Sequence, residues 1–279
     1  MSALADDIRA LSRSITLPWG EEGDILSLDH VLDLSRRHGV SGRIVEIKAL
    51  RLGIRPLRYL RNQQSLSPED QARLLESAVA MVGLGGLGGT LLEVLLRAGA
   101  GIIRCADGDR FEESNLNRQT LSTPAGLGRS KTDMARERAE ALNPSVDFEA
   151  ENAYLTSRSL PDFLSGCRVA VDALGGLSHR LELQRAAAGA GIPMVTGALA
   201  GFSGYVGVVL PGDTGPADIM GRDNAAEESL GCPSPSVTCI AALMAAEIIR
   251  LSIGHPSPLA GKMLVADLQA MSFETVAIA

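Results

Sequence analysis

A glycine-rich loop between an apolar strand and a helix is the feature that most restricts the fold of this chain. The segment GLGGLGG at residues 83–89 follows the continuous apolar run AVAMV at 78–82. The sequence TLLEVLLRAG then continues from residue 90 with the apolar period of a helix. A fully apolar strand, a tight loop and a helix make the first part of a βαβ unit. The pattern therefore predicts a parallel sheet covered by helices.

The same alternation of strands and helices continues along the chain. We expect further strands and helices at residues 101–107, 130–142, 146–150, 157–165 and 168–173. Nearer the C-terminus, the sequence predicts a half-exposed strand at 203–213, a long apolar helix at 236–254, and a hairpin or strand pair at 262–278. Residues 211–235, rich in Gly, Pro, Asp and Ser, are expected to form a mobile crossover loop. The predicted fold is a Rossmann-like α/β domain over residues 56–279, with a mixed, mainly parallel sheet flanked by helices.

Residues 1–55 are predicted to form a small N-terminal extension. Ser27 can cap a helix through LDHVLDLSRRHG, which Gly39 would end. A second strong helix start follows at Ser67, Pro68 and Asp70, which have the positions of an N-cap, a first-turn proline and a third-position acid. These signals are local, and they assign no function to the extension.

Composition limits the kinds of partner that this chain can bind. A formal net charge of −7 argues against nucleic acid or an anionic membrane as the partner of a broad surface. The four cysteines show no CxxC pair, and the four histidines are scattered, so we expect no zinc site. The N-terminal sequence MSALADDIRA is acidic where a signal peptide would be basic. We therefore expect a cytoplasmic protein.

The glycine loop is a candidate phosphate-binding site. Gly83, Gly85 and Gly86 would let phosphates approach the backbone at a helix N-terminus, which carries unpaired N–H groups. Asp107, at the end of the next strand, is placed to bind a ribose diol. The alternatives are a loop that is tight only for packing and an aspartate that only ends a strand. Because the glycines stand between a strand and a helix, nucleotide binding is the preferred interpretation.

A group of polar residues after Asp107 indicates more than a dinucleotide site. The segment SNLNRQ contributes Asn115, Arg118 and Gln119, and GRSK contributes Lys131 at the start of a predicted helix. Singly, each of these could be a solvated surface residue. Two cations near one glycine loop suit a triphosphate, since Arg offers a bidentate fork and Lys a point charge. An NAD-dependent oxidoreductase, the weaker alternative, has no obvious use for them.

The ordered series GLGGLGG, DGD, SNLNRQ, GRSK and Asn143-Pro144 resembles the MoeB/ThiF/HesA branch of the ubiquitin-activating-enzyme-like superfamily. The resemblance runs from about Arg58 to the C-terminus. It implies an adenylyltransferase that uses ATP and Mg²⁺ to adenylate the C-terminal glycine of a ubiquitin-like sulfur carrier ending in Gly-Gly, such as ThiS or MoaD. Such enzymes serve thiamin, molybdopterin or related sulfur-transfer pathways, and the resemblance implies a homodimer.

The resemblance also implies roles for single residues. Phosphates would contact the glycine loop, and Asn115, Arg118 and Lys131 would hold the triphosphate. Arg61, the second arginine of RYLRN, resembles an arginine that reaches the nucleotide of the other subunit; the alternative is a helix-surface arginine. Cys232, in GCPSPS, is a candidate nucleophile.

Two departures from the family pattern affect metal ions. The two CxxC pairs that hold a structural zinc in many relatives are absent. The family pattern D-x-x-D-N after the fourth strand appears here as DALGG, so Gly175 replaces the aspartate expected to bind magnesium. Asp172 is the preferred substitute ligand and Asp109 the second candidate. If neither compensates, the chain would be a non-catalytic homologue that binds nucleotide or carrier.

Overall fold

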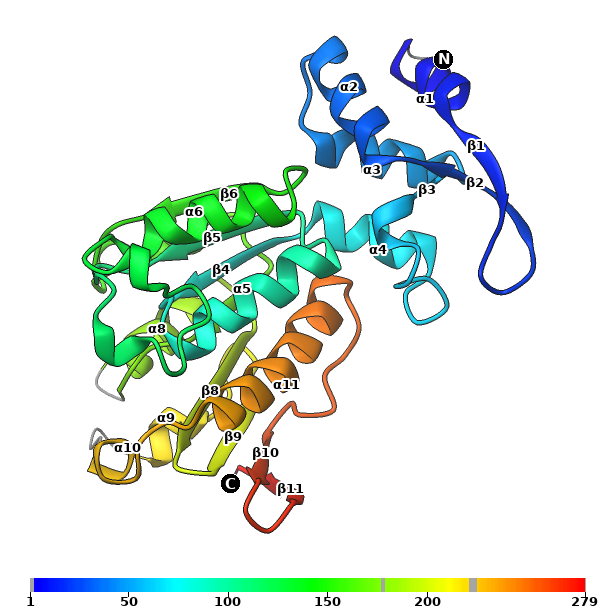
Figure 1. Cartoon of the computed structure of the whole chain (residues 1–279). Helices are drawn as coiled ribbons and strands as arrows, with labels where there is room; N and C mark the ends of the chain where they lie inside the picture. The colour runs from blue at the N-terminus through cyan, green and yellow to red at the C-terminus, as the bar shows by residue number, and fades with distance from the viewer. Residues whose placement is uncertain (1–2, 177–178, 221–224, 279) are drawn as a thin grey trace.

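The computed structural model describes residues 3–176, 179–220 and 225–278. Within them, an eight-stranded sheet has the order β11-β10-β9-β8-β7-β4-β5-β6 (Figure 1). The strands are β4 (Ala78–Val82), β5 (Ile102–Ala106), β6 (Asp147–Glu151), β7 (Val169–Asp172), β8 (Met194–Ala200), β9 (Ser203–Val209), β10 (Lys262–Asp267) and β11 (Ser272–Ala277). The five neighbouring strands β8, β7, β4, β5 and β6 pair in parallel. Strands β9, β10 and β11 continue the sheet beyond β8 and pair antiparallel. The predicted mixed, mainly parallel sheet is confirmed.

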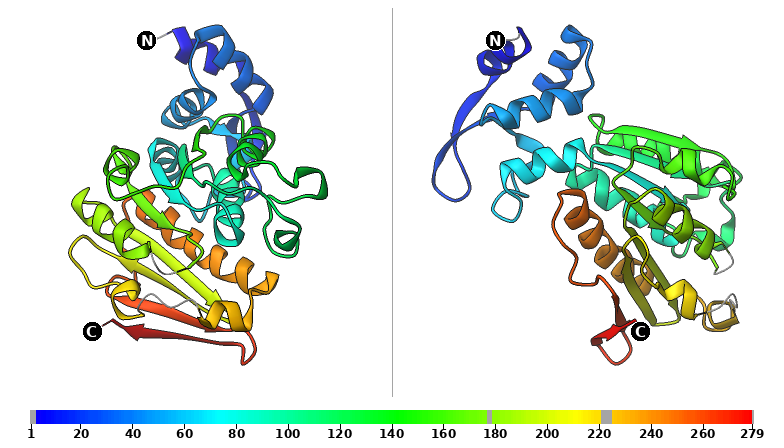
Figure 2. Two further views of the ribbon diagram at one scale, coloured as in Figure 1. Left: turned by 90° about the vertical axis from the view of Figure 1, so that its left-hand side faces the viewer. Right: turned by 180° about the vertical axis from the view of Figure 1, so that it is seen from behind.

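Helices cover both faces of this sheet, as the views in Figures 1 and 2 show. One face carries α5 (Gly86–Ala98), α6 (Lys131–Leu142) and α11 (Ser234–Ser252), and the other carries α7 (Leu160–Leu164) and α8 (Arg180–Gly189). The central strand β4 shows why both faces must be covered. Its residues Val79 and Met81 join the core under α5 and α11, whereas Ala80 and Val82 join the core under α7 and α8, because successive side chains of a strand point to opposite faces.

The C-terminal third differs in detail from the expectation. β9 was expected to be half exposed, but five of its seven residues are buried, because β9 pairs with both β8 and β10 and is covered by α11. The stretch 211–235 is not only loop: it holds the short helices α9 (Pro216–Ile219) and α10 (Ala225–Leu230). The part of this stretch at 221–224 lies outside the described residues. The C-terminal hairpin β10–β11 is confirmed.

Helix α11 passes a test of length and composition for a membrane-spanning helix. In the fold, however, it packs against α5, β8 and β9. Its residues Val237, Ile240 and Met244 are among the buried side chains of the main core. Its length and apolar composition are therefore those of a helix buried in the core of the domain.

The N-terminal part consists of α1 (Ala3–Leu11), β1 (Arg13–Thr16), β2 (Glu22–Leu26), α2 (Leu28–His38), α3 (Gly42–Arg51) and β3 (Arg55–Pro56). Its three short strands form a second sheet, and its helices enclose a small core that includes Ile8, Leu26 and Leu34. The predicted helix start is confirmed, because the Ser27 hydroxyl accepts a hydrogen bond from the His30 amide at 3.3 Å.

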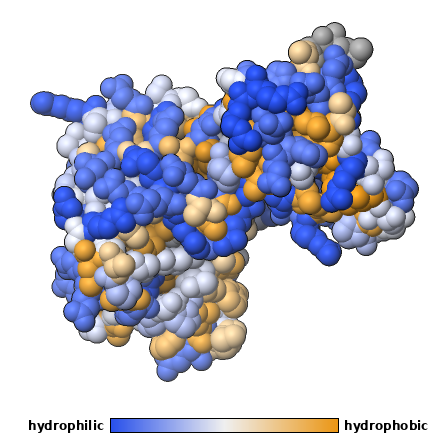
Figure 3. Space-filling view, turned by 45° about the horizontal axis from the view of Figure 1, so that its top comes forward, coloured by the Kyte–Doolittle hydropathy of each residue, from blue (hydrophilic) through white to orange (hydrophobic). Residues whose placement is uncertain are grey.

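Hydrophilic residues predominate on the face of the molecule shown in Figure 3, with apolar patches between them.

A buried polar network joins this N-terminal part to the main sheet. α3 packs on α4 (Pro68–Glu76), whose predicted capping box is present. The carboxylate of Glu46, 0% exposed, accepts hydrogen bonds from the Ser145 hydroxyl at 3.1 Å and the Tyr59 hydroxyl at 3.3 Å. Asn143 donates to that same Tyr59 oxygen at 2.8 Å. The network ties the extension to the turn between α6 and β6.

Candidate active site

A cleft of about 960 Å³ opens at the carboxyl ends of the parallel strands. Residues that follow β4, β5, β6 and β7 line it, together with the start of α8 and residues before and in α11. Ligands of open α/β sheets bind at this edge, because the loops that leave the strand ends diverge there. The cleft contains most of the predicted site residues: Gly83, Gly85, Gly86, Asp107, Asp109, Asn115, Arg118, Gln119, Lys131 and Cys232.

The glycine loop serves packing and leaves space for a ligand. Gly83 has a φ of +102°, and a Cβ there would lie 2.3 Å from the carbonyl oxygen of Ala173, so only glycine fits. At Gly85 a Cβ would make only an ordinary contact, 3.7 Å from the Gln119 amide nitrogen. Gly85 and Gly86 line the cleft at the first turn of α5. Packing thus requires glycine at Gly83 and at Gly88, where a Cβ would lie 2.0 Å from the Gly83 carbonyl oxygen, and Gly86 is close to Val237 at 3.1 Å. Gly85 has more room, and it stands at a helix N-terminus, which favours an anion.

Asp107 fixes the glycine loop from the end of β5. One carboxylate oxygen accepts a hydrogen bond from the Leu84 amide at 2.7 Å, and the other accepts from the Asp109 amide at 2.8 Å. The residue is 9% exposed and lines the cleft. Since each carboxylate oxygen can accept more than one hydrogen bond, Asp107 retains acceptor capacity for a ligand hydroxyl.

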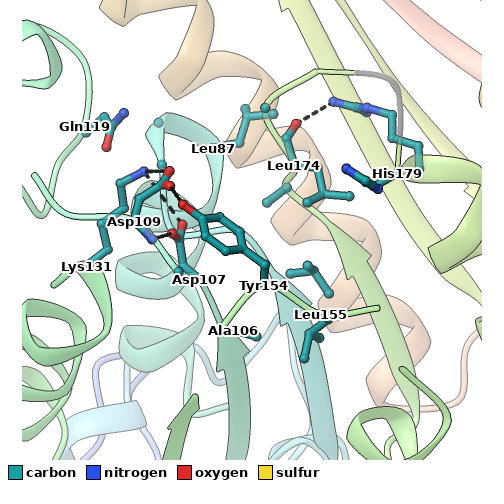
Figure 4. A pocket seen from close by; sticks show the side chains of 18 of the residues that line it. Leu87, Ala106, Asp107, Asp109, Gln119, Lys131, Tyr154, Leu155, Leu174 and His179 are labelled. Atoms are coloured by element: carbon teal, nitrogen blue, oxygen red, sulfur yellow. Dashed lines mark hydrogen bonds and ion pairs between the residues drawn. The ribbon is translucent and has the colours of Figure 1, made fainter. Parts of the chain in front are cut away.

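Lys131 is a buried cation at the first position of α6. Ser130 caps this helix by accepting a hydrogen bond from the Asp133 amide at 3.2 Å. The Lys131 side chain is 7% exposed, and its Nζ lies 2.8 Å from Asp109 Oδ2 and 3.8 Å from Asp107 Oδ2 (Figure 4). Burial opposes ionisation of Asp109, but hydrogen bonds from Lys131 and Tyr154 outweigh it and lower the pKa of this carboxyl.

The polar segment after Asp109 brings three side chains to the cleft. Arg118 Nη1 donates to the Ser114 carbonyl oxygen at 2.8 Å and to the Asn117 amide oxygen at 2.9 Å. Asn115 accepts from the Glu112 amide at 3.1 Å. Gln119 is 8% exposed, and its Oε1 has no hydrogen-bond partner within the described residues. A buried amide oxygen without a partner beside the glycine loop fits a site that a polar ligand completes.

Two predicted site residues, Arg61 and Asp172, do not line the cleft. Arg61 is exposed and does not line the cleft of its own chain. Asp172, the preferred magnesium ligand, is 0% exposed. Its carboxylate accepts hydrogen bonds from the Leu174 amide, the Thr196 hydroxyl and the Arg180 guanidinium. A buried carboxylate bound in this way is not available to a metal ion in the cleft, so the structure contradicts that role.

The described part of the chain offers few candidate ligands for magnesium in the cleft. No group of three or more His, Cys, Asp or Glu side chains with metal-binding geometry occurs among the described residues. Gly175 lines the cleft, and a Cβ there would meet nothing within 4 Å in the part of the chain that the structure describes. Space for the missing carboxylate therefore exists where the side chain does not. Of the two proposed ligands, only Asp109 lines the cleft.

Sequence reasoning missed two residues of this site. Arg180 is 2% exposed and, besides Asp172, binds the carbonyl oxygens of Leu174 at 2.7 Å and Gly176 at 2.9 Å. Tyr154 follows β6 and stands in the cleft beside Asp109. For Arg180 the only sequence signal was its place a few residues after the DALGG segment, and for Tyr154 there was none.

Comparison with known proteins agrees with the fold and the motifs. The model of the ThiF family matches residues 59–279. The sulfur carrier protein adenylyltransferase of Thermus thermophilus is 35% identical over 76% of this chain and 83% of its own length. The sulfur carrier protein ThiS adenylyltransferase of Escherichia coli is 30% identical over 80% of this chain and 91% of its own. The crystal structure of E. coli MccB with ATP, 19% identical, superposes with a TM-score of 0.69 over 80% of this chain and 72% of that one. The chain belongs to the ThiF family, as its ordered motifs predict.

Proposed function

We propose that this protein is an ATP-dependent adenylyltransferase that activates the C-terminal glycine of a ubiquitin-like sulfur carrier. The observation that carries the proposal is the position of Lys131, a buried cation within 3.8 Å of Asp107 and beside the glycine loop. Arg118 adds a second positive charge to the same cleft. Two relatives named as sulfur carrier adenylyltransferases support this substrate class.

In the proposed reaction a carboxylate oxygen of the carrier's terminal glycine attacks the α-phosphorus of ATP. A new P–O bond forms, the bond to the β-phosphate oxygen breaks, and pyrophosphate leaves with the electron pair. The products are the carrier acyl-adenylate and pyrophosphate. Negative charge develops on the α-phosphate and on the leaving group, and the N-terminus of α5, Lys131 and Arg118 are the groups of this chain that would stabilise it.

Lys131 can serve the phosphates without losing its present partner. Its ammonium group has three donors, and Asp109 Oδ2, at 2.8 Å, occupies one. The Asp109 contact then fixes the ammonium group in advance, so that little reorganisation is needed when a triphosphate binds. On this proposal Asp107 binds the ribose, and Asn115 and Gln119 add polar contacts.

We propose that Mg²⁺ binds to the protein together with ATP. The ion prefers oxygen ligands and commonly takes one or two carboxylates, with phosphate and water for the rest. No group of three or more His, Cys, Asp or Glu ligands occurs among the described residues, and no step is assigned to the ion. Asp109 remains the proposed protein contact.

The remaining parts of the proposal concern the assembly. We propose a cytoplasmic homodimer in which the exposed Arg61 reaches the nucleotide of the partner subunit. Residues 1–55 would form the N-terminal extension, and residues 56–279 the adenylation domain. Cys232, at the cleft, is the candidate to attack the acyl carbon of the adenylate, which would release AMP and leave a thioester.

The proposal is tested by incubating the protein with ATP, Mg²⁺ and small carriers that end in Gly-Gly. A carrier that gains the mass of an adenylyl group, with release of pyrophosphate, supports it. The same carrier without its last glycine must give no product. Binding of ATP with no product from any carrier would instead support the non-catalytic alternative. Tighter calorimetric binding of NAD than of ATP would contradict both.

A further inference from the structure

The cleft contains one exposed aromatic side chain that the proposed chemistry does not use. Tyr154 follows β6 and is 73% exposed, although it lines the cleft. Among the described residues of the cleft lining it is the sole Phe, Tyr or Trp, in a chain of which only 3% is aromatic. Figure 4 shows it in the middle of the cleft, between the group around Asp109 and the side that holds Leu174.

The ring of Tyr154 is held on one side and open on the other. Its hydroxyl donates a hydrogen bond to Asp109 Oδ1, and the other oxygen of this carboxylate binds Lys131. The ring lies on the backbone of Gly108, where an added Cβ would be only 2.6 Å from a ring carbon. Glycine at this position therefore allows the ring to lie close to the backbone. The large exposed fraction means that the remaining ring surface is uncovered.

The surroundings of the ring divide the cleft into two parts. Asp107, Lys131 and Arg118 form a charged part next to the glycine loop. The second part, which we call the apolar part, lies beyond Tyr154, where Figure 4 shows Leu174 and also His179. The cleft lining as a whole includes the apolar residues Ala153, Leu155, Leu160, Ala173 and Leu183, together with the polar Thr156 and Glu182. A nucleotide with its ribose on Asp107 and its phosphates on the charged part would direct its base toward the apolar part. A flat aromatic base is the component that suits both an apolar wall and an open aromatic ring.

We propose that Tyr154 stacks on the nucleobase and makes the site selective for purine nucleotides. This assignment rests on the proposed function, because it needs a nucleotide in the cleft. The Asp109 hydrogen bond and the Gly108 contact hold the ring in place, so little freedom is lost on stacking. Removal of a stacking aromatic side chain weakens binding of a base by about 5- to 100-fold. A purine has the larger stacking surface and gains more than a pyrimidine.

The test is calorimetric titration of the full-length protein with ATP, CTP and tripolyphosphate, which has no base. Tyr154→Ala should weaken ATP binding by about 5- to 100-fold and leave tripolyphosphate binding unchanged. The preference for ATP over CTP should fall. Tyr154→Phe keeps the ring but lacks the hydroxyl that bonds Asp109, so it should retain most of the wild-type affinity for ATP. Phe273→Ala, which removes a 49% exposed ring from β11 at the opposite edge of the sheet, is the matched control and should bind as wild type.

A second variant tests the position of the ring without removing it. Gly108→Ala places a Cβ against the ring and should displace it, so ATP binding should weaken while tripolyphosphate binding persists. In a Tyr154→Ala background the same change should have no further effect. Equal ATP affinity of wild type and Tyr154→Ala, or equal losses for ATP and tripolyphosphate, would overturn the assignment and leave the proposed function intact. A wild-type protein that binds no ATP would overturn both.

Discussion

Arg180 and Asp172 form a fully buried ion pair, with 3.0 Å between Nη1 and Oδ2 and side chains that are 2% and 0% exposed. Arg180 also binds the carbonyl oxygens of Leu174 and Gly176. These contacts hold the loop after β7, which carries Gly175 and forms one wall of the cleft. The pair explains why Asp172 cannot serve as a metal ligand: its carboxylate is a structural partner of the arginine that shapes this wall.

The first prediction concerns this ion pair. Arg180→Met leaves Asp172 as an uncompensated buried charge and should cost about 3–5 kcal/mol of the free energy of unfolding. Urea denaturation monitored by circular dichroism measures it. The control is Arg129→Ala, which breaks an exposed pair with Glu137 and should leave the stability unchanged within error. A loss no larger than that of the control would show that the buried pair does not stabilise the fold.

The second prediction is a dependence of stability on pH that arises at Glu46. Burial raises the pKa of this carboxyl from its ordinary value of 4.5 to about 7, against opposing contributions from Arg58 and from the Ser145 and Tyr59 hydroxyls. The unfolded chain loses the proton near pH 4.5, whereas the folded chain keeps it until about pH 7. Between these values the folded state binds more protons, so its stability must fall as pH rises, by about 3 kcal/mol in total.

Glu46→Gln removes this titration and keeps an acceptor for Ser145. The free energy of unfolding of wild type, measured in urea at pH 5 and pH 8, should decrease with pH by more than that of the variant. Glu140→Gln, at an exposed position of α6, is the control and should retain the wild-type slope. An unchanged slope in Glu46→Gln would exclude Glu46 as the source.

The third prediction concerns the missing carboxylate. A Cβ added at Gly175 would meet no atom of the described residues within 4 Å, and the backbone there is not in the left-handed region, so Gly175→Asp should fold normally. If the metal contact limits the wild-type rate, the variant should adenylate a cognate carrier about 10- to 100-fold faster, on the scale of supporting residues at metal sites. The measurement is pyrophosphate release at varied Mg²⁺. A wild-type rate that Gly175→Asp leaves unchanged, but that Asp109→Ala abolishes, would show that Asp109 already compensates.

The fourth prediction concerns a site shared between subunits. Arg61→Ala and Arg118→Ala chains should each be nearly inactive as homodimers. In their heterodimer, one of the two sites has both arginines intact, so activity should return to about half that of wild type. Separately tagged chains, purified as the heterodimer, provide the assay. A monomer in solution, or no rescue in a verified heterodimer, would reduce Arg61 to a surface residue.

The parts of the fold that the sequence predicts well depend on neighbouring residues. Ser67 and Asp70 form the capping box of α4 because the cap needs residues only three positions apart. β4, the glycine loop and α5 likewise follow from one continuous segment. The order of motifs along the chain was enough to indicate the family. The first two motifs follow the successive strands β4 and β5, GRSK leads into α6, and Asn143-Pro144 follows that helix.

The parts that failed depend on contacts between distant segments. The burial of β9 is decided by its neighbours β8 and β10 and by α11, which no alternation within β9 can reveal. The sequence places Asp172 at the end of a strand, where a metal ligand is expected. Its hydrogen bonds with Arg180 and Thr196, which belong to a helix and to another strand, are visible only in the structure. Tyr154 reaches the cleft because β6 lies beside β5, a pairing that brings its ring to Gly108.

Carrier-dependent exchange of labelled pyrophosphate into ATP is the decisive measurement of adenylation, because exchange requires reversible formation of the acyl-adenylate. We expect exchange that needs ATP, Mg²⁺ and a carrier ending in Gly-Gly. Lys131→Ala should lower the exchange rate by about 100-fold or more, whereas Arg129→Ala, two residues earlier and outside the cleft lining, should retain it. Exchange that persists at the wild-type rate in Lys131→Ala, or that is absent with every Gly-Gly carrier even for Gly175→Asp, would contradict the account.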